Sequence, residues 1–112
     1  MRYRSRVLVG AIGLAVGLSG WVGAADAADA VIDQLGLKFV PATVTIKAGD
    51  SVRFENHDPF THDITVVSSD GSKSDKGLQH HGEDRTVAFP KAGTFSIICS
   101  MHPNMKATVI VK

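Results

Sequence analysis

The chain of 112 residues contains a single cysteine, Cys99, and shows no helix-period pattern longer than a turn or two after residue 30. One cysteine cannot form a disulfide within the chain, so the intrachain disulfide that commonly stabilises a small exported domain is excluded. Lysine and arginine number 12 against 11 aspartate and glutamate residues. Nothing in this near balance suggests binding to nucleic acid or to an anionic membrane surface. No repeat or linker divides the chain, which indicates one domain.

The first 27 residues have the organisation of a secretory signal peptide. Three arginines within the first six residues are followed by an apolar stretch and then by small residues in A-x-A patterns. We expect cleavage after Ala27, or alternatively after Ala30, which leaves a periplasmic domain of residues 28–112. The rival interpretation is an uncleaved anchor, because the 19 uncharged residues of 7–25 approach the ~20 that span a bilayer.

Short β-rich runs separated by turn signals make up the remainder of the chain. The segment 68–82 is polar and rich in glycine, serine and aspartate, and we expect it to be a long loop or a poorly formed segment. This spacing of runs predicts an all-β sandwich of about seven to eight strands. The predicted strands are residues 35–40, 43–47, 51–55, 63–67, 85–89, 94–99 and 107–112.

Three potential metal ligands lie within seven residues, directly after an apolar strand-like run. Cys99, His102 and Met105 have the spacing C-x2-H-x2-M. Thiolate and thioether donors select copper, and a Cys/His/His site with a weak axial Met is the blue-copper arrangement. The loop supplies only one histidine, so a second must come from elsewhere. His62 is the candidate, because it lies where a loop enters another predicted strand.

Each of these residues also has a structural interpretation. Cys99 alone would be a small buried hydrophobe, and Met105 alone a filler of the core. His62 and His102 would be ordinary strand-end and turn residues. The combination favours copper over these alternatives. Zinc is the rival metal, but zinc sites seldom use methionine.

The chain resembles the cupredoxins of the plastocyanin/amicyanin type over residues 37–112. The resemblance is carried by the stretches 39–56, 62–66 and 92–106. It implies a Greek-key sandwich of eight strands that holds one type 1 copper ion. The ligands that it implies are His62, Cys99, His102 and Met105.

Two departures from the family pattern lie beside the first ligand. Thr61 and Asp63 stand where family members commonly have proline and asparagine. The asparagine helps to brace the cysteine loop, so the resemblance implies altered bracing and a more tetragonal copper site here.

The resemblance implies a monomeric periplasmic electron carrier that is not an enzyme. Such a carrier docks transiently with a cytochrome or a dehydrogenase through the apolar surface around His102. The alternative is a copper-tolerance or copper-capture protein, because three further histidines, His57, His80 and His81, would suit a second metal site. Their structural interpretation is that they are solvated loop residues. A purely structural sandwich module is the third candidate, and for it Cys99→Ala would change nothing. Copper oxidase chemistry is not expected, because the chain has no separate histidine cluster.

Overall fold

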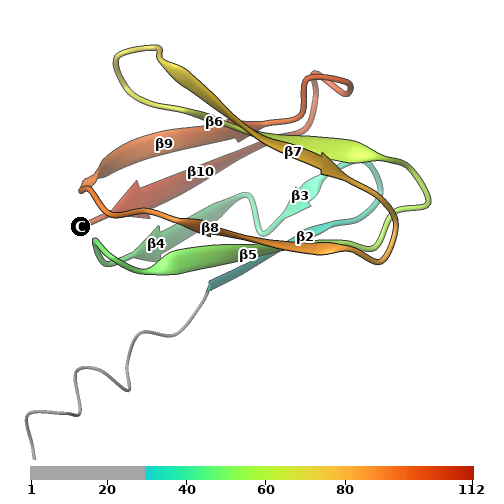
Figure 1. Ribbon diagram of the computed structural model, residues 1–112, viewed down its shortest axis with the longest axis horizontal. Coiled ribbons are helices and arrows are strands. Elements are labelled where there is room, and N and C mark those ends of the chain that lie inside the picture. The colour runs from blue at the N-terminus through green and yellow to red at the C-terminus, as the bar shows by residue number, and fades with distance from the viewer. Residues whose placement is uncertain (1–29) are drawn as a thin grey trace, which may run out of the picture.

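The computed structural model describes residues 30–112, which form a sandwich of two β-sheets (Figure 1). One sheet has five strands in the order β4-β10-β9-β6-β7, and the other has four in the order β3-β2-β5-β8. None of the described residues belongs to a helix that could cross a membrane. The strands of this part of the chain are β2 (Ala30–Gln34), β3 (Phe39–Val40), β4 (Thr43–Ile46), β5 (Ser51–Asn56), β6 (His62–Val67), β7 (Lys73–Gln79), β8 (Asp84–Ala88), β9 (Gly93–Ile98) and β10 (Lys106–Val111).

The core lies between the two sheets and follows from the alternation of side chains along each strand. In β5, Val52 and Phe54 are fully buried, while Arg53 between them faces outward. Phe54 packs edge-on against Phe39 of β3, with ring centroids 6.2 Å apart. Ile64 of β6 and Ile97 of β9 meet them from the opposite sheet and are also fully buried. The prediction of an all-β sandwich is therefore confirmed. The predicted leader, residues 1–27, lies outside the described residues.

The prediction of a long loop over residues 68–82 is wrong, because β7 occupies its centre. β7 is the edge strand of the five-stranded sheet and pairs only with β6. Most of its side chains are exposed, so the strand has no buried face to leave an alternating apolar pattern. Its lysines, glycine and aspartate are typical of edge strands that avoid pairing with other molecules.

The predicted strand over residues 35–40 is also largely wrong. Pairing there is confined to β3, and the preceding strand is β2, which the sequence analysis missed. Between them the chain bends, with Gly36 and Leu37 at φ values of 66° and 59°. β2 pairs in parallel with β5, from Ala30 opposite Val52 to Gln34 opposite Asn56. This non-local pairing leaves no signal in the short polar and apolar run of β2 itself.

The topology brings distant segments to one end of the sandwich. β6 and β9 are antiparallel neighbours, with Thr65 opposite Ile98, so the start of β6 lies beside the end of β9. Figure 1 shows the β5–β6, β7–β8 and β9–β10 connections at this end, with the C-terminus at the other.

Candidate metal centre

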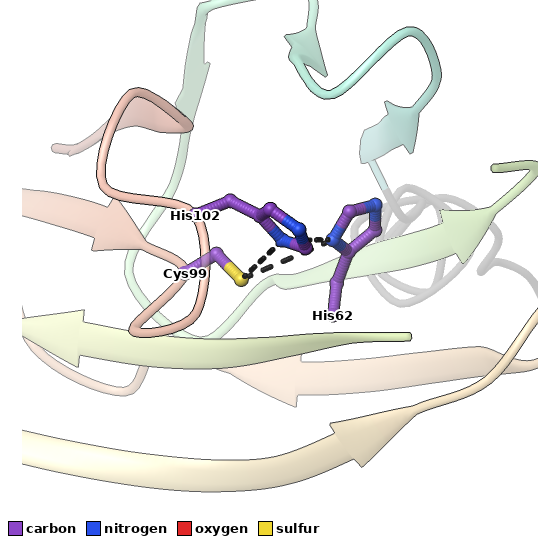
Figure 2. A group of neighbouring side chains, drawn as sticks. All are labelled: His62, Cys99 and His102. Atoms are coloured by element: carbon purple, nitrogen blue, oxygen red, sulfur yellow. Dashed lines mark hydrogen bonds between the residues drawn. The ribbon is translucent and has the colours of Figure 1, made fainter. Parts of the chain in front are cut away.

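Three side chains converge at this end of the sandwich (Figure 2). His62 is the first residue of β6, Cys99 follows β9, and His102 lies in the turn between β9 and β10. Their ligand atoms all lie within 4.8 Å of one another. Cys99 Sγ is 3.9 Å from His62 Nδ1 and 3.7 Å from His102 Nδ1, and the two nitrogens are 3.1 Å apart.

This triangle of donor atoms has the size that a metal ion requires. A point equidistant from its three corners lies about 2.1 Å from each, close to the ~2.0–2.3 Å of metal bonds to imidazole nitrogen and thiolate sulfur. One soft thiolate and two imidazoles fit copper. Burial raises the pKa of the Cys99 thiol, so a bound metal ion would have to displace the thiol proton.

The centre is buried, with one ligand reaching the surface. His62 has no exposed surface and Cys99 is 1% exposed, whereas His102 is half-buried. Phe60 and Met101, which are 51% and 45% exposed, flank it, and the Phe60 and His102 ring centroids are 6.3 Å apart. His102 is therefore the candidate ligand nearest to solvent and to any docked molecule.

The Cys99–Met105 segment is held by its own backbone. The His102 amide donates to the Cys99 carbonyl at 3.3 Å, and the Met105 amide donates to the His102 carbonyl at 2.9 Å. Met105 itself has no exposed surface. The two successive turns follow from the short spacing between the predicted ligands, and they return the chain to the interior before β10 begins.

Asp63 braces this segment despite its departure from the family pattern. Its carboxylate accepts hydrogen bonds from the Ser100 amide at 2.6 Å and from the Ser100 hydroxyl at 2.7 Å. Its own amide donates to Cys99 Sγ at 3.5 Å. Burial raises the pKa of the Asp63 carboxyl, but the bonds from Ser100 outweigh this and hold the pKa below its usual range. The carboxylate thus braces the cysteine loop, and it places a negative charge close to the thiol.

Asp58 fixes the orientation of His62, and the sequence analysis missed it. This carboxylate is 2% exposed. It accepts hydrogen bonds from His62 Nε2 at 2.8 Å and from the amides of Gly36 and Leu37 at 2.6 and 2.9 Å. Burial raises the pKa of Asp58, but these three bonds hold it below the usual range. With its Nε2 proton donated to Asp58, His62 presents the Nδ1 lone pair to the centre.

The signal for Asp58 is present in the sequence as an acidic residue four positions before the predicted histidine. Such spacing is common on exposed loops, so it has little weight alone. Its meaning depends on the bend at Gly36 and Leu37, whose two amides aim at the carboxylate from a distant segment.

The three additional histidines do not join the centre. His80 Nδ1 lies 2.9 Å from the Thr61 hydroxyl, and His81 Nδ1 donates to the Asp58 carbonyl at 2.7 Å. His57 instead contacts Asp33. Within residues 30–112, only His57 belongs to a second group of potential ligands, with Asp33 and Glu55.

Comparison with known proteins agrees with this centre. Residues 26–112 match the family of copper binding proteins described as the plastocyanin/azurin family. The chain belongs to this family. Membership of the cupredoxins confirms the resemblance found in the sequence and copper as the cofactor.

The relatives include plastocyanins and amicyanins. A chloroplastic plastocyanin of Tetradesmus obliquus is 39% identical over 90 residues, which cover 71% of this chain and 62% of that protein. Amicyanin-alpha of Methylorubrum extorquens is 32% identical over 101 residues, which cover 88% of this chain and 85% of that protein. The matched region spans less than two thirds of the Tetradesmus plastocyanin and of the plastocyanin of Chlamydomonas reinhardtii, of which it covers 54%.

Solved structures confirm the cupredoxin fold. The crystal structure of amicyanin from Paracoccus versutus matches 80% of this chain and 88% of its own with a TM-score of 0.70 and 27% identity. A copper-containing nitrite reductase from Thermus scotoductus matches 76% of this chain with a TM-score of 0.68 and 29% identity. Only 22% of the reductase chain is covered, so that likeness concerns one part of a larger protein.

Proposed function

We propose that this cupredoxin carries single electrons between redox proteins, through a copper site formed by His62, Cys99, His102 and Met105. The observation that supports this most is the buried triangle of one sulfur and two nitrogens with edges of 3.1 to 3.9 Å. When bound, copper supplies a one-electron couple between its cuprous and cupric forms. Met105, buried at the end of the same turn, would supply a thioether sulfur as the fourth, weaker ligand.

The protein contributes a rigid, largely dry site. Asp58 holds the ring of His62, and Asp63 holds the backbone and hydroxyl of Ser100, directly after Cys99. Donors fixed in this way keep their positions in both the cuprous and the cupric form of the site. A site that moves little on gaining or losing an electron has a small reorganisation cost, and electron transfer is then fast.

The exposed apolar surface around His102 would receive the partner. Leu37, Phe60 and Met101 are 40 to 51% exposed, and Pro103 lies in the same turn. A patch of this kind suits the small, transient contacts of redox proteins. We propose a cytochrome or a dehydrogenase as the partner, a monomer as the working state, and export to the periplasm with removal of residues 1–27.

A Cu(II) titration of the mature chain tests the proposal. We expect an intense thiolate-to-copper absorption band that saturates at one equivalent and is absent in Cys99→Ser. Met105→Leu keeps an apolar side chain of similar volume, so the absorption band should remain. The reduction potential should rise, because the thioether no longer stabilises the cupric form relative to the cuprous form. An unchanged potential in Met105→Leu would remove Met105 from the ligand set. The absence of the band in the unaltered chain would overturn the proposal.

A copper-capture role is the second candidate, favoured by the group of Asp33, Glu55 and His57. A capture protein should bind more than one copper ion and should matter under copper stress. Deletion of the gene separates the two roles: loss of copper tolerance supports capture, whereas unaltered tolerance with impaired respiration or substrate oxidation supports the electron carrier.

A further inference from the structure

A row of acidic side chains crosses the outer face of the four-stranded sheet. Asp33 of β2 lies opposite Glu55 of β5, and Glu55 lies opposite Asp84 of β8. Their neighbours Ile32 and Phe54 are fully buried, so these carboxylates point away from the core. Like charges directly opposite on adjacent strands are destabilising. A cation bound among these side chains would therefore reduce the repulsion between the carboxylates.

His57 lies at the end of this row. Its amide donates to the carbonyl of Gln34 at 3.0 Å, which ties the residue after β5 to the end of β2. Its Nδ1 contacts Asp33 Oδ1, and 53% of its side chain is exposed. Asp33, Glu55 and His57 thus offer one nitrogen and two carboxylate oxygens that lie within 4.8 Å of one another.

Arg53 is a fixed cation beside the row. Arg53 Nε pairs with Glu55 Oε2 at 2.8 Å, and both residues come from β5, two positions apart. The pair is partly exposed, and such pairs contribute little to stability. The imidazole of His57 faces the carboxylate of Asp33 at the end of the row.

The chemistry of these donors selects the kind of ion. Carboxylates alone would suit magnesium or calcium, but an imidazole nitrogen favours a transition metal. Mixed nitrogen and oxygen donors without a thiolate suit tetragonal Cu(II), which also binds most tightly in the divalent series. The exposure of His57 leaves room for water to complete the coordination. Such a site would not give the intense thiolate band of the buried centre.

We propose that Asp33, Glu55 and His57 form a second, solvent-exposed site that binds one Cu(II) ion. The site shares no side chain with the buried centre of His62, Cys99 and His102. It gives the protein a surface position for cupric ions that is built by the parallel pairing of β2 and β5. The other accessory histidines, His80 and His81, do not belong to this group of neighbouring ligand atoms. Their Nδ1 atoms contact the Thr61 hydroxyl and the Asp58 carbonyl.

The test starts from the mature chain already loaded with one equivalent of copper, to which further Cu(II) is added. We expect a second equivalent with an ordinary tetragonal EPR signal and an unchanged thiolate band. His57→Gln should abolish it, and Asp33→Asn or Glu55→Gln should weaken its binding at least about tenfold. The matched controls His80→Gln and His81→Gln should leave it intact, and an unchanged thiolate band in every variant shows that each is folded.

Three results would overturn the second site. One is the absence of a second equivalent in the unaltered chain. Another is a second equivalent that persists in His57→Gln, which would place the ion elsewhere, for example on the amino terminus. The third is loss in the His80 or His81 control but not in His57→Gln. Each is distinct from failure of the proposed electron carrier, which is read from the thiolate band alone.

Discussion

Asp58 shows how one side chain beside a metal centre sets the properties of a ligand. It holds the Nε2 proton of His62 with a buried carboxylate, and two backbone amides hold that carboxylate in turn. A carboxylate partner makes an imidazole a more basic ligand and fixes its tautomer. A more basic ligand favours the cupric over the cuprous form, so Asp58 should lower the reduction potential of the centre.

We expect Asp58→Asn to raise the reduction potential. Loss of a partner of this kind typically costs about 10–100-fold in metal affinity. If the loss falls on the cupric form, the shift is about 60 to 120 mV, at 59 mV per tenfold for one electron. Voltammetry of the copper-loaded protein measures it. The control is Asp70→Asn, which removes a carboxylate that likewise caps a turn, on Ser72. Equal potentials in Asp58→Asn and the unaltered chain would contradict this role.

At the scale of the elements, the edge strands β7 and β8 belong to different sheets but are joined by one side chain. Arg85 of β8 donates from Nη1 to the carbonyl of Lys76 and from Nη2 to that of Leu78 at 2.8 Å. Gly77 between them leaves the space that the Arg85 side chain occupies in this contact. A Cβ there would lie 2.5 Å from Arg85 Nη1, and its φ of 97° disfavours other residues. Arg85 thereby closes one side of the sandwich.

Arg85→Ala should loosen β7 without altering the metal centre. Loss of two exposed hydrogen bonds should reduce the free energy of unfolding by about 1–2 kcal/mol. Amide hydrogen exchange should accelerate in Lys73–Gln79 more than in β5. The reason is that β7 is an edge strand that pairs with β6 alone in its sheet, whereas β5 lies between β2 and β8. Urea denaturation and exchange measure the two effects, with Arg85→Lys as the partial control. Uniform or unchanged exchange would show that Arg85 does not hold this edge.

For the whole molecule, the metal centre joins segments that are far apart in the chain. His62 and Cys99 are 37 positions apart, and they come from neighbouring strands of the five-stranded sheet. An ion bound to both favours the folded state, because the unfolded chain does not hold these donors together. Copper should therefore stabilise the fold as well as supply its redox chemistry.

Copper removal should lower the thermal stability of the mature chain. At free copper of about 1,000 times Kd, binding adds about 4 kcal/mol. For a domain of this size that corresponds to a rise in Tm of about 15 to 30 °C. Calorimetry of the loaded and metal-free forms measures the difference. Cys99→Ser should lose most of it, while His57→Gln, outside the buried centre, should keep it. Equal Tm values for the two forms would contradict the coupling of folding to copper.

The loop that carries Cys99, His102 and Met105 is predictable from the sequence, because all three residues lie within seven positions. A segment that short brings its side chains together by its own turns, and the turns are those observed. The choice of His62 needed only the expectation that a strand begins there, which β6 confirms. The all-β class followed from the same local patterns of alternation and turn residues.

What only the tertiary structure decided depends on pairing between distant strands. The support of His62 by Asp58 requires the bend at Gly36 and Leu37, and the group around His57 requires the parallel register of β2 and β5. The sequence by itself determined the donors that one turn can gather, since their spacing is local. It did not determine their partners, because strand register arises from packing of the whole core rather than from any single segment.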